Sequence, residues 1–542
     1  MFGLILATTT LQPLQTFTLG QAERLPADSL GIVTFVTDSN QWRGVPFDPL
    51  SLASGALLQQ IAAAVGLSAQ SLSFERDLRP WIGQHSALVF FLPSKGMKVS
   101  QLLLLRSRDQ KAFAAFQQRL SEGNRAAIAE VYRGVPIQTW VRGKDGGSSP
   151  ETALVIALLP DDTVVLGRDK AAVQQYLDGR DRPDQARLSN LPLFRRAVGN
   201  ALWGRSLVAG YGNYTALAEY WKRLEGTEAE FLQGFQASIL DQYTHYDMVV
   251  WPAAGGLRLR SSAYARRPLP VVTYPSRRLL QRLPAEVLTV AASSNLRSQW
   301  QWVEQESKRN IAYSFVVGLI NEAVQSSFNL NIRRDLLPWL GGEYAFVVYP
   351  TQTELMDGFW GTRDLKIGFG LLLETSDRRR TEMVLRSINQ AIPRLTKQRV
   401  RPVSRRLGSV TMTSFEVDRT NSRRRFSVLS YGWQNNRTLM VTSGLGAARG
   451  LMPPRTILAN SGDFQRAIAQ LPQQNYGYSY TNLSRFAQLG VEFFTLASDG
   501  GKLDPTSSQV VEQLKKLGSL TVVYSQTPEA FTTDAYLSVP MR

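Results

Sequence analysis

The sequence predicts an α+β protein made of two tandem homologous units, each with a largely antiparallel sheet packed by long helices. At 542 residues, the chain is longer than one hydrophobic core usually supports, so more than one domain is expected. Strand-like segments follow one another in runs more often than they alternate with helices, which favours α+β over α/β. Segments of the first half recur in the second half, which indicates that one unit was duplicated.

Two recurring segments carry the predicted duplication. The first, Leu25–Leu30, reads LPADSL and recurs as LPAEVL at Leu283–Leu288, 258 residues further along. The second, Arg76–Gly83, reads RDLRPWIG and recurs as RDLLPWLG at Arg334–Gly341, with the same offset of 258 residues. Later segments match at larger offsets, as expected if the loops of the second copy are longer. Identical spacing between two separate matches is hard to obtain by chance.

The expected order of elements is the same in each unit. A strand, a long helix and an Asp-x-x-Pro-Trp turn come first, followed by two strands, a helix and a run of strands. A short strand–turn–helix, another helix, a strand, a long helix and a final hairpin complete the unit. Apolar positions at helical spacing (Phe113, Phe116, Leu120) mark the helices, and alternating Val, Ile and Thr mark the strands.

The predicted organisation is an N-terminal segment (1–20), a first unit (21–268), a proline-rich linker (269–280) and a second unit (281–542) with a basic insertion (376–425). The apolar start has no Lys or Arg before it. It suits either the remnant of an export signal or an ordinary N-terminal strand. No window reaches the roughly 18 apolar residues that span a bilayer, so no transmembrane helix is predicted.

Three features together resemble a known family: the Leu-Pro-Ala-Asp strand, the Asp-x-x-Pro-Trp-Ile/Leu-Gly turn and the strand–Asn–helix steps at Asn213 and Asn482. The chain is similar to an uncharacterised family of cyanobacterial proteins that is catalogued only as a domain of unknown function. The resemblance covers most of both halves. It implies a bacterial, cyanobacterial protein of a kind that is often exported or membrane-associated. Members commonly begin with a membrane segment, which this chain lacks, and the resemblance implies no activity.

Composition argues against several chemistries. The chain has no cysteine, which excludes disulfides, thiolate nucleophiles, cysteine-ligated zinc and iron–sulfur clusters. Its only histidines are His85 and His245, both in the first half, and a structural role is expected for His85. A serine triad or a zinc site needs a histidine held by defined partners. The sequence therefore predicts no enzyme activity, no cofactor and no metal site.

Three further motifs are interpreted as structural. The glycines of Gly444–Gly450 could suit a dinucleotide, but the matching stretch of the first copy has Asp169, which would repel phosphate and caps a helix well. A strand–turn–helix is the simpler prediction. Asn213 and Asn482 match the glycosylation sequon, yet helix capping is the better explanation. Asp77, like its counterpart in the second copy, is expected to stabilise a turn rather than to serve as a catalytic carboxylate.

The charge is the feature that points to a partner. The net charge is +17, of which residues 1–270 carry +5 and the remainder +12. Residues 376–425 alone hold 14 Lys or Arg against 4 Asp or Glu, and the first copy lacks these clusters. The predicted anion-binding residues are the clustered arginines Arg378, Arg379, Arg380, Arg405, Arg406, Arg423, Arg424 and Arg425.

The expected function is a non-enzymatic binding, assembly or scaffold protein that uses this arginine-rich face on an anionic partner. Lipid headgroups and an acidic protein complex are the main alternatives, and nucleic acid ranks third because no reading motif is found. A carrier of an apolar ligand, lipid or pigment, within the curved sheets is the rival hypothesis. The expected location is extracytoplasmic (periplasm or thylakoid lumen) or peripheral to a membrane, and a cytoplasmic location stays open.

Overall fold

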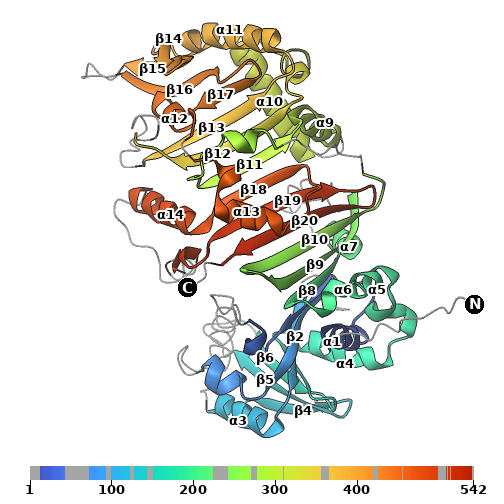
Figure 1. Ribbon diagram of the computed structural model, residues 1–542. Coiled ribbons are helices and arrows are strands. Elements are labelled where there is room, and N and C mark those ends of the chain that lie inside the picture. The colour runs from blue at the N-terminus through green and yellow to red at the C-terminus, as the bar shows by residue number, and fades with distance from the viewer. Residues whose placement is uncertain are drawn as a thin grey trace, which may run out of the picture. The chain divides into compact units, whose positions relative to one another are not determined.

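The computed structural model describes fifteen stretches of the chain (Figure 1): 13–42, 72–92, 99–122, 127–142, 151–223, 242–269, 277–308, 311–353, 355, 365–418, 425–454, 456–497, 508, 511–512 and 514–539. They form two compact units. Unit 1 comprises Met1–Ala229, Ile239–Ala254 and Leu259–Arg267, and unit 2 comprises Glu230–Ser238, Gly255–Arg258 and Pro268–Arg542. Each unit combines helices with an antiparallel sheet, so the predicted α+β class is confirmed. No helix within the described stretches is long and apolar enough to cross a membrane.

The sheet of unit 1 has the strand order β9–β8–β1–β2–β3–β7–β6–β5–β4, with every neighbour antiparallel. Its strands are β1 (Gly31–Val36), β2 (Ile82–Phe91), β3 (Ser100–Ser107), β4 (Ile128–Tyr132), β5 (Val135–Arg142), β6 (Glu151–Leu158), β7 (Thr163–Gly167), β8 (Val208–Asn213) and β9 (Tyr243–Ala253). The strand β10 (Gly256–Ala265) follows β9 and pairs with it.

The sheet of unit 2 has the order β20–β19–β18–β11–β12–β13–β17–β16–β15–β14, again antiparallel throughout. Its strands are β11 (Thr289–Ser294), β12 (Glu343–Pro350), β13 (Ile367–Glu374), β14 (Val400–Leu407), β15 (Val410–Asp418), β16 (Arg425–Trp433), β17 (Thr438–Thr442), β18 (Gly477–Asn482), β19 (Ser519–Gln526) and β20 (Ala530–Ser538).

The helices of the two units are the following. Those of unit 1 are α1 (Pro13–Ala22), η1 (Ser39–Trp42), η2 (Phe74–Leu78), α3 (Gln110–Ser121), α4 (Lys170–Asp178), η3 (Gly179–Asp181), η4 (Asp184–Ala186), η5 (Leu188–Asn190), α5 (Pro192–Val198), α6 (Ala201–Gly204) and α7 (Tyr214–Lys222). Those of unit 2 are η6 (Leu279–Arg282), α9 (Leu296–Ser307), α10 (Ile311–Phe328), η7 (Ile332–Leu336), η8 (Leu337–Trp339), α11 (Arg378–Leu395), α12 (Leu445–Gly450), η10 (Leu458–Asn460), α13 (Gly462–Ala469) and α14 (Leu483–Ala497).

Local irregularities recur at matching places. The sheet register shifts between Trp140 and Val141 in β5 and between Phe415 and Glu416 in β15. Each of these strands is the second strand of a hairpin, β4–β5 in unit 1 and β14–β15 in unit 2. Both η2 and η7 are single π-helical turns that precede the Pro-Trp pair. A bulge is a specific local feature of a strand pair, so its recurrence supports common descent. The tandem duplication itself stays a prediction.

The predicted helix caps are confirmed. The Asn213 side chain accepts a hydrogen bond from the backbone N–H of Ala216 at 3.0 Å, and Asn482 accepts one from Arg485 at 3.1 Å. Asp169 accepts from the N–H of Ala171 at 2.9 Å. These bonds satisfy backbone donors that have no partner within the first helical turn.

Unit 1 has a core on each face of its sheet, because alternate residues of a strand point to opposite faces. On one face Leu104 joins a cluster that includes Trp203 and the helices α1 and α5. On the other face Leu105 joins Trp81 and the helix α3. In unit 2, Phe415, Tyr431 and Leu439 pack beneath α10 and α11.

Three boundary predictions need correction. Residues 13–22 form the helix α1 rather than a strand, and α1 belongs to the core of unit 1 because Leu14 and Phe17 are buried there. The predicted linker is only partly linker, since Leu279–Arg282 folds as η6, and 270–276 lie outside the described residues. The basic stretch 376–425 is no insertion, because α11, β14 and β15 have counterparts of the same order in α3, β4 and β5.

Candidate anion-binding surface

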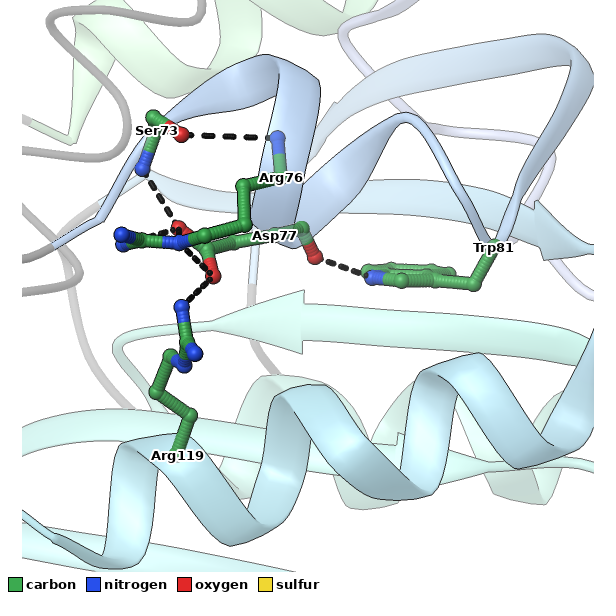
Figure 2. A network of polar contacts seen from close by, with 5 residues as sticks. All are labelled: Ser73, Arg76, Asp77, Trp81 and Arg119. Carbon is green, nitrogen blue, oxygen red and sulfur yellow. Dashed lines mark hydrogen bonds and ion pairs between the residues drawn. The ribbon is translucent and has the colours of Figure 1, made fainter.

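The aspartate of the first Asp-x-x-Pro-Trp turn is the centre of a buried polar network (Figure 2). The Asp77 carboxylate is 4% exposed and accepts hydrogen bonds from the Ser73 N–H at 2.6 Å, from Arg76 Nη2 at 2.9 Å and from Arg119 Nη1 at 2.8 Å. Trp81 Nε1 donates to the Asp77 carbonyl at 2.7 Å. Burial raises the pKa of Asp77, but the hydrogen bonds from Arg76 and Ser73 and the charge of Arg119 outweigh it and hold the pKa below its usual range.

The second turn repeats this geometry with fewer contacts. The Asn331 N–H donates to Asp335 at 2.8 Å, Arg334 Nε donates to the same carboxylate at 2.8 Å, and Trp339 Nε1 donates to the Asp335 carbonyl at 2.9 Å. The Arg334 guanidinium holds the pKa of Asp335 below its usual range. Both carboxylates are therefore ionised acceptors engaged with the turn, which agrees with a structural role.

The two histidines lie within the packed interior of unit 1. His85 is half-buried beside Phe17 at 5.8 Å between ring centroids, and burial lowers its pKa. His245 stacks on Tyr264 at 4.4 Å, and its Nε2 is buried without a hydrogen-bond partner among the described residues. Burial, together with the charge of Arg196, lowers the pKa of His245 to about 4. The imidazole of His245 is therefore neutral near pH 7 and lies between the rings of Tyr211 and Tyr264.

The first arginine cluster lies at the start of α11. Arg378 is held locally, because it donates to Glu382 at 2.9 Å and to Asn436 at 3.0 Å and lies 4.6 Å from the ring centroid of Trp433. Arg379 and Arg380 are exposed. The Asp377 side chain caps the helix by accepting from the N–H of Arg380 at 3.0 Å.

The rest of α11 has one side that is packed in the core and one exposed side that is basic. Val384 and Ile388 pack into the core of unit 2, so α11 is a packed domain helix. The opposite side presents Arg379, Met383 and Arg386 to solvent, with Met383 50% exposed. Residues three to four apart share one face of a helix, which aligns these side chains in a stripe.

The neighbouring helix α10 has an apolar outer side that the sequence interpretation missed. Phe315 is 64% exposed, Leu319 is 50% exposed, and Val316 and Ile320 lie beside them. Val324 and Phe328 face inward and pack on the same core as α11. Since α10 and α11 cover one face of the sheet, the apolar stripe of α10 and the basic stripe of α11 both point away from that face.

The second arginine cluster lies on the face of the unit 2 sheet that points away from α10 and α11. Tyr431 accepts from Asn389 of α11 at 2.7 Å, so the next residue, Gly432, points to the other face, together with its register partners Met412 and Met440. Arg405 pairs with Met412 and therefore also faces away from α11.

Arg425 lies on that same face, two residues before Ser427, whose hydroxyl accepts from the Leu445 N–H of α12 at 2.8 Å. Arg406 is exposed near the end of the β14–β15 hairpin, where its Nε donates to the Gly408 carbonyl at 3.3 Å. Arg423 and Arg424 lie outside the described residues.

The predicted single arginine-rich face is thus two separate surfaces of unit 2. The α10–α11 surface carries Arg379, Arg380 and Arg386, and the α12 side of the sheet carries Arg405 and Arg425. Sequence spacing could not separate them, because a strand reverses the face of its side chains at every residue and the hairpin register is set by tertiary pairing. Arg386 and the apolar stripe of α10 were readable from helical periodicity alone.

Comparison with known proteins identifies a family whose function is unknown. Within the described residues, no three His, Asp or Glu side chains gather as the ligands of a metal ion do. No curated protein and no solved structure matches the chain. The model of the family described as "Protein of unknown function (DUF3352)" matches residues 2–529, and the chain belongs to that family.

Proposed function

We propose that the protein is a non-enzymatic binding or assembly protein that attaches to an anionic membrane surface through unit 2. The observation that supports this most is that α10 and α11 pack on the same core, on one face of one sheet, and that the exposed side of α10 is apolar while that of α11 is basic. Exposed apolar residues rimmed by basic ones are typical of surfaces that lie at the headgroup level of a bilayer. An extracytoplasmic or membrane-peripheral location is part of this proposal.

The combination of the two stripes favours lipid over an acidic protein. Each Lys or Arg near an anionic bilayer contributes about 1 kcal/mol, and this attraction is screened by salt. Phe315 and Leu319 would enter the apolar boundary, a contribution that salt does not weaken. An acidic protein complex remains an outcome that the experiment can reveal. The cavities beside Arg24 and Arg297 are lined mainly by charged and polar side chains, which gives a carrier of apolar ligands no support.

Co-sedimentation with vesicles tests the proposal. The full chain is expected to sediment with vesicles of phosphatidylcholine and phosphatidylglycerol and far less with phosphatidylcholine alone. Replacing Arg379 and Arg386 by glutamine should lower the partition coefficient on the anionic vesicles about 30-fold at low salt, because two surface charges are lost. Replacing Phe315 and Leu319 by serine should weaken binding at low and high salt alike.

A matched control removes the same charge elsewhere. Arg180 and Arg205 are exposed arginines of unit 1, and changing both to glutamine should leave vesicle binding within about twofold, a small effect typical of isolated surface charges. The proposal is wrong if the unchanged protein stays in the supernatant with anionic vesicles. It is also wrong if the control variant and the Arg379/Arg386 variant lose binding equally.

A further inference from the structure

We propose that the α12 side of unit 2 holds a second site, independent of membrane attachment, that binds a small ligand through a phosphate group. A cleft of about 440 Å³ lies there, lined among others by Arg405, Arg425, Arg449, Glu416, Ser427 and Gly446. Its volume falls within the range of small-molecule sites, roughly 300–1,000 Å³. Three guanidinium groups from three different elements converge on it, although they are far apart in the sequence.

The position of Arg405 is fixed by a buried carboxylate. Arg405 Nε and Nη2 donate to the two oxygens of Glu416, both at 2.7 Å, and Glu416 is 7% exposed. Glu416 points to this face by the ordinary alternation of β15, two residues after Ser414. The extra residue of the bulge lies in β16, at Val428, and brings Ser427 and Arg425 to the same face. The bidentate pair raises the pKa of Arg405, neutralises Glu416 and leaves the second amino group of the guanidinium, Nη1, for a ligand.

The other two arginines carry the excess positive charge. Arg425 donates through Nε to Asp418 at 2.9 Å, and its side chain is 53% exposed. Arg449 is an exposed residue of α12 and has no carboxylate partner within the part of the chain that the structure describes. With Asp418 and Glu416 each occupied by one arginine, Arg449 remains as an uncompensated cation at the rim of the cleft. Arginine suits phosphate because its planar fork offers paired N–H donors.

The floor of the cleft is rigid. Ser427 accepts from the Leu445 N–H at 2.8 Å and is 2.7 Å from the Ser414 hydroxyl, which ties α12 to β15 and β16. Gly446 lets Thr353 approach closely, since a Cβ at that glycine would lie 2.1 Å from the threonine Oγ1. The helix α12 spans only six residues, so the proposal rests on the arginines and not on the end of the helix.

The position in the β4–β5 hairpin of unit 1 that matches Arg405 is occupied by an acidic residue, Glu130. Glu130 is the third residue before the turn of the β4–β5 hairpin and pairs with Ile137. Arg405 is likewise the third residue before the turn of the β14–β15 hairpin and pairs with Met412. Glu130 is bound by Lys170 of α4 at 2.6 Å, so the position is already neutralised. The charge reversal from Glu130 to Arg405 is therefore not required by the fold and is consistent with recruitment of an anion in unit 2.

Isothermal titration of the full chain in chloride buffer tests this site, with inorganic phosphate, pyrophosphate and citrate as probes. Saturable binding of phosphate or pyrophosphate is expected. Arg449→Gln should weaken it at least about tenfold and Arg425→Gln by a similar factor, because each removes charge-assisted hydrogen bonds. Both side chains are exposed, so the thermal unfolding temperature of these variants should match that of the unchanged protein. Arg405 is left intact, because its loss would leave Glu416 buried and unpaired.

The Arg379→Gln/Arg386→Gln variant serves as the control, since it removes two charges from the opposite face. It should bind phosphate like the unchanged protein. The site is refuted by absence of saturable binding of both phosphate probes, or by an equal loss of affinity in the control variant. Tighter binding of citrate than of pyrophosphate would refute a phosphate ligand. Because vesicle binding and phosphate binding are separate measurements, and each loss is expected from different substitutions, failure of one proposal leaves the other standing.

Discussion

Replacing Asp77 by alanine is expected to lower the free energy of unfolding of unit 1 by about 3 kcal/mol, because the buried carboxylate makes several charge-assisted hydrogen bonds and all of them are lost. The Ser73 N–H would lose its acceptor, while Arg76 and Arg119 would lose a shared anion but could still reach water, being 52% and 38% exposed. Trp81 would keep its hydrogen bond, since that bond goes to the backbone carbonyl of residue 77.

The matched change in unit 2 should cost less. Asp335 has one arginine partner and is 21% exposed, so Asp335→Ala is expected to cost about 1 kcal/mol. Hydrogen exchange in urea measures the two units separately, through the amides of β2 and α3 for one and of β12 and α11 for the other. Separate readouts are needed because a chain with two units does not have to unfold in one step. Equal losses in the two variants would contradict the different burial of the two carboxylates.

Acidification is expected to destabilise unit 1 by up to about 3 kcal/mol between pH 6.5 and pH 4, through His245. The pKa of His245 falls to about 4 in the folded protein, below its ordinary value of 6.5. As the pH drops, the unfolded chain therefore takes up a proton before the folded protein does. The stability linked to His245 is present above pH 6.5 and is lost as the pH falls toward about 4.

Neighbouring groups set the size of this effect. Burial raises the pKa of Asp247, which accepts a hydrogen bond from Tyr264 at 2.9 Å, so its protonation at low pH offsets part of the loss. His245→Phe keeps an aromatic ring against Tyr264 and removes the titrating group. Urea unfolding from pH 7 to pH 4.5 should give a steep loss for the unchanged protein and a shallower one for His245→Phe. Parallel pH profiles for the two proteins would contradict the role of His245.

Local chemistry made several features predictable. Asp169, Asn213 and Asn482 cap helices because a short polar side chain at the end of a strand can reach the free N–H groups of the next turn. The Pro-Trp turns and the α+β class also follow from patterns within about ten residues. The order of elements is only partly tested, because the two long helices predicted for the first unit fall largely on 43–71 and 224–241, outside the described residues. The helix over residues 13–22 was not predictable in this way, since a short apolar run suits a strand as well as a buried helix.

The sequence by itself determined that the chain is basic, that its excess charge lies in the second half, and that the fold is α+β. Only the tertiary structure decided how that charge is shared between two faces of one sheet. Arg379 and Arg386 follow one helix, whereas Arg405, Arg425 and Arg449 meet through strand pairing, a bulge and the packing of α12. The physical reason is that charge is a property of composition, while the facing of a side chain depends on register and on partners distant in the chain.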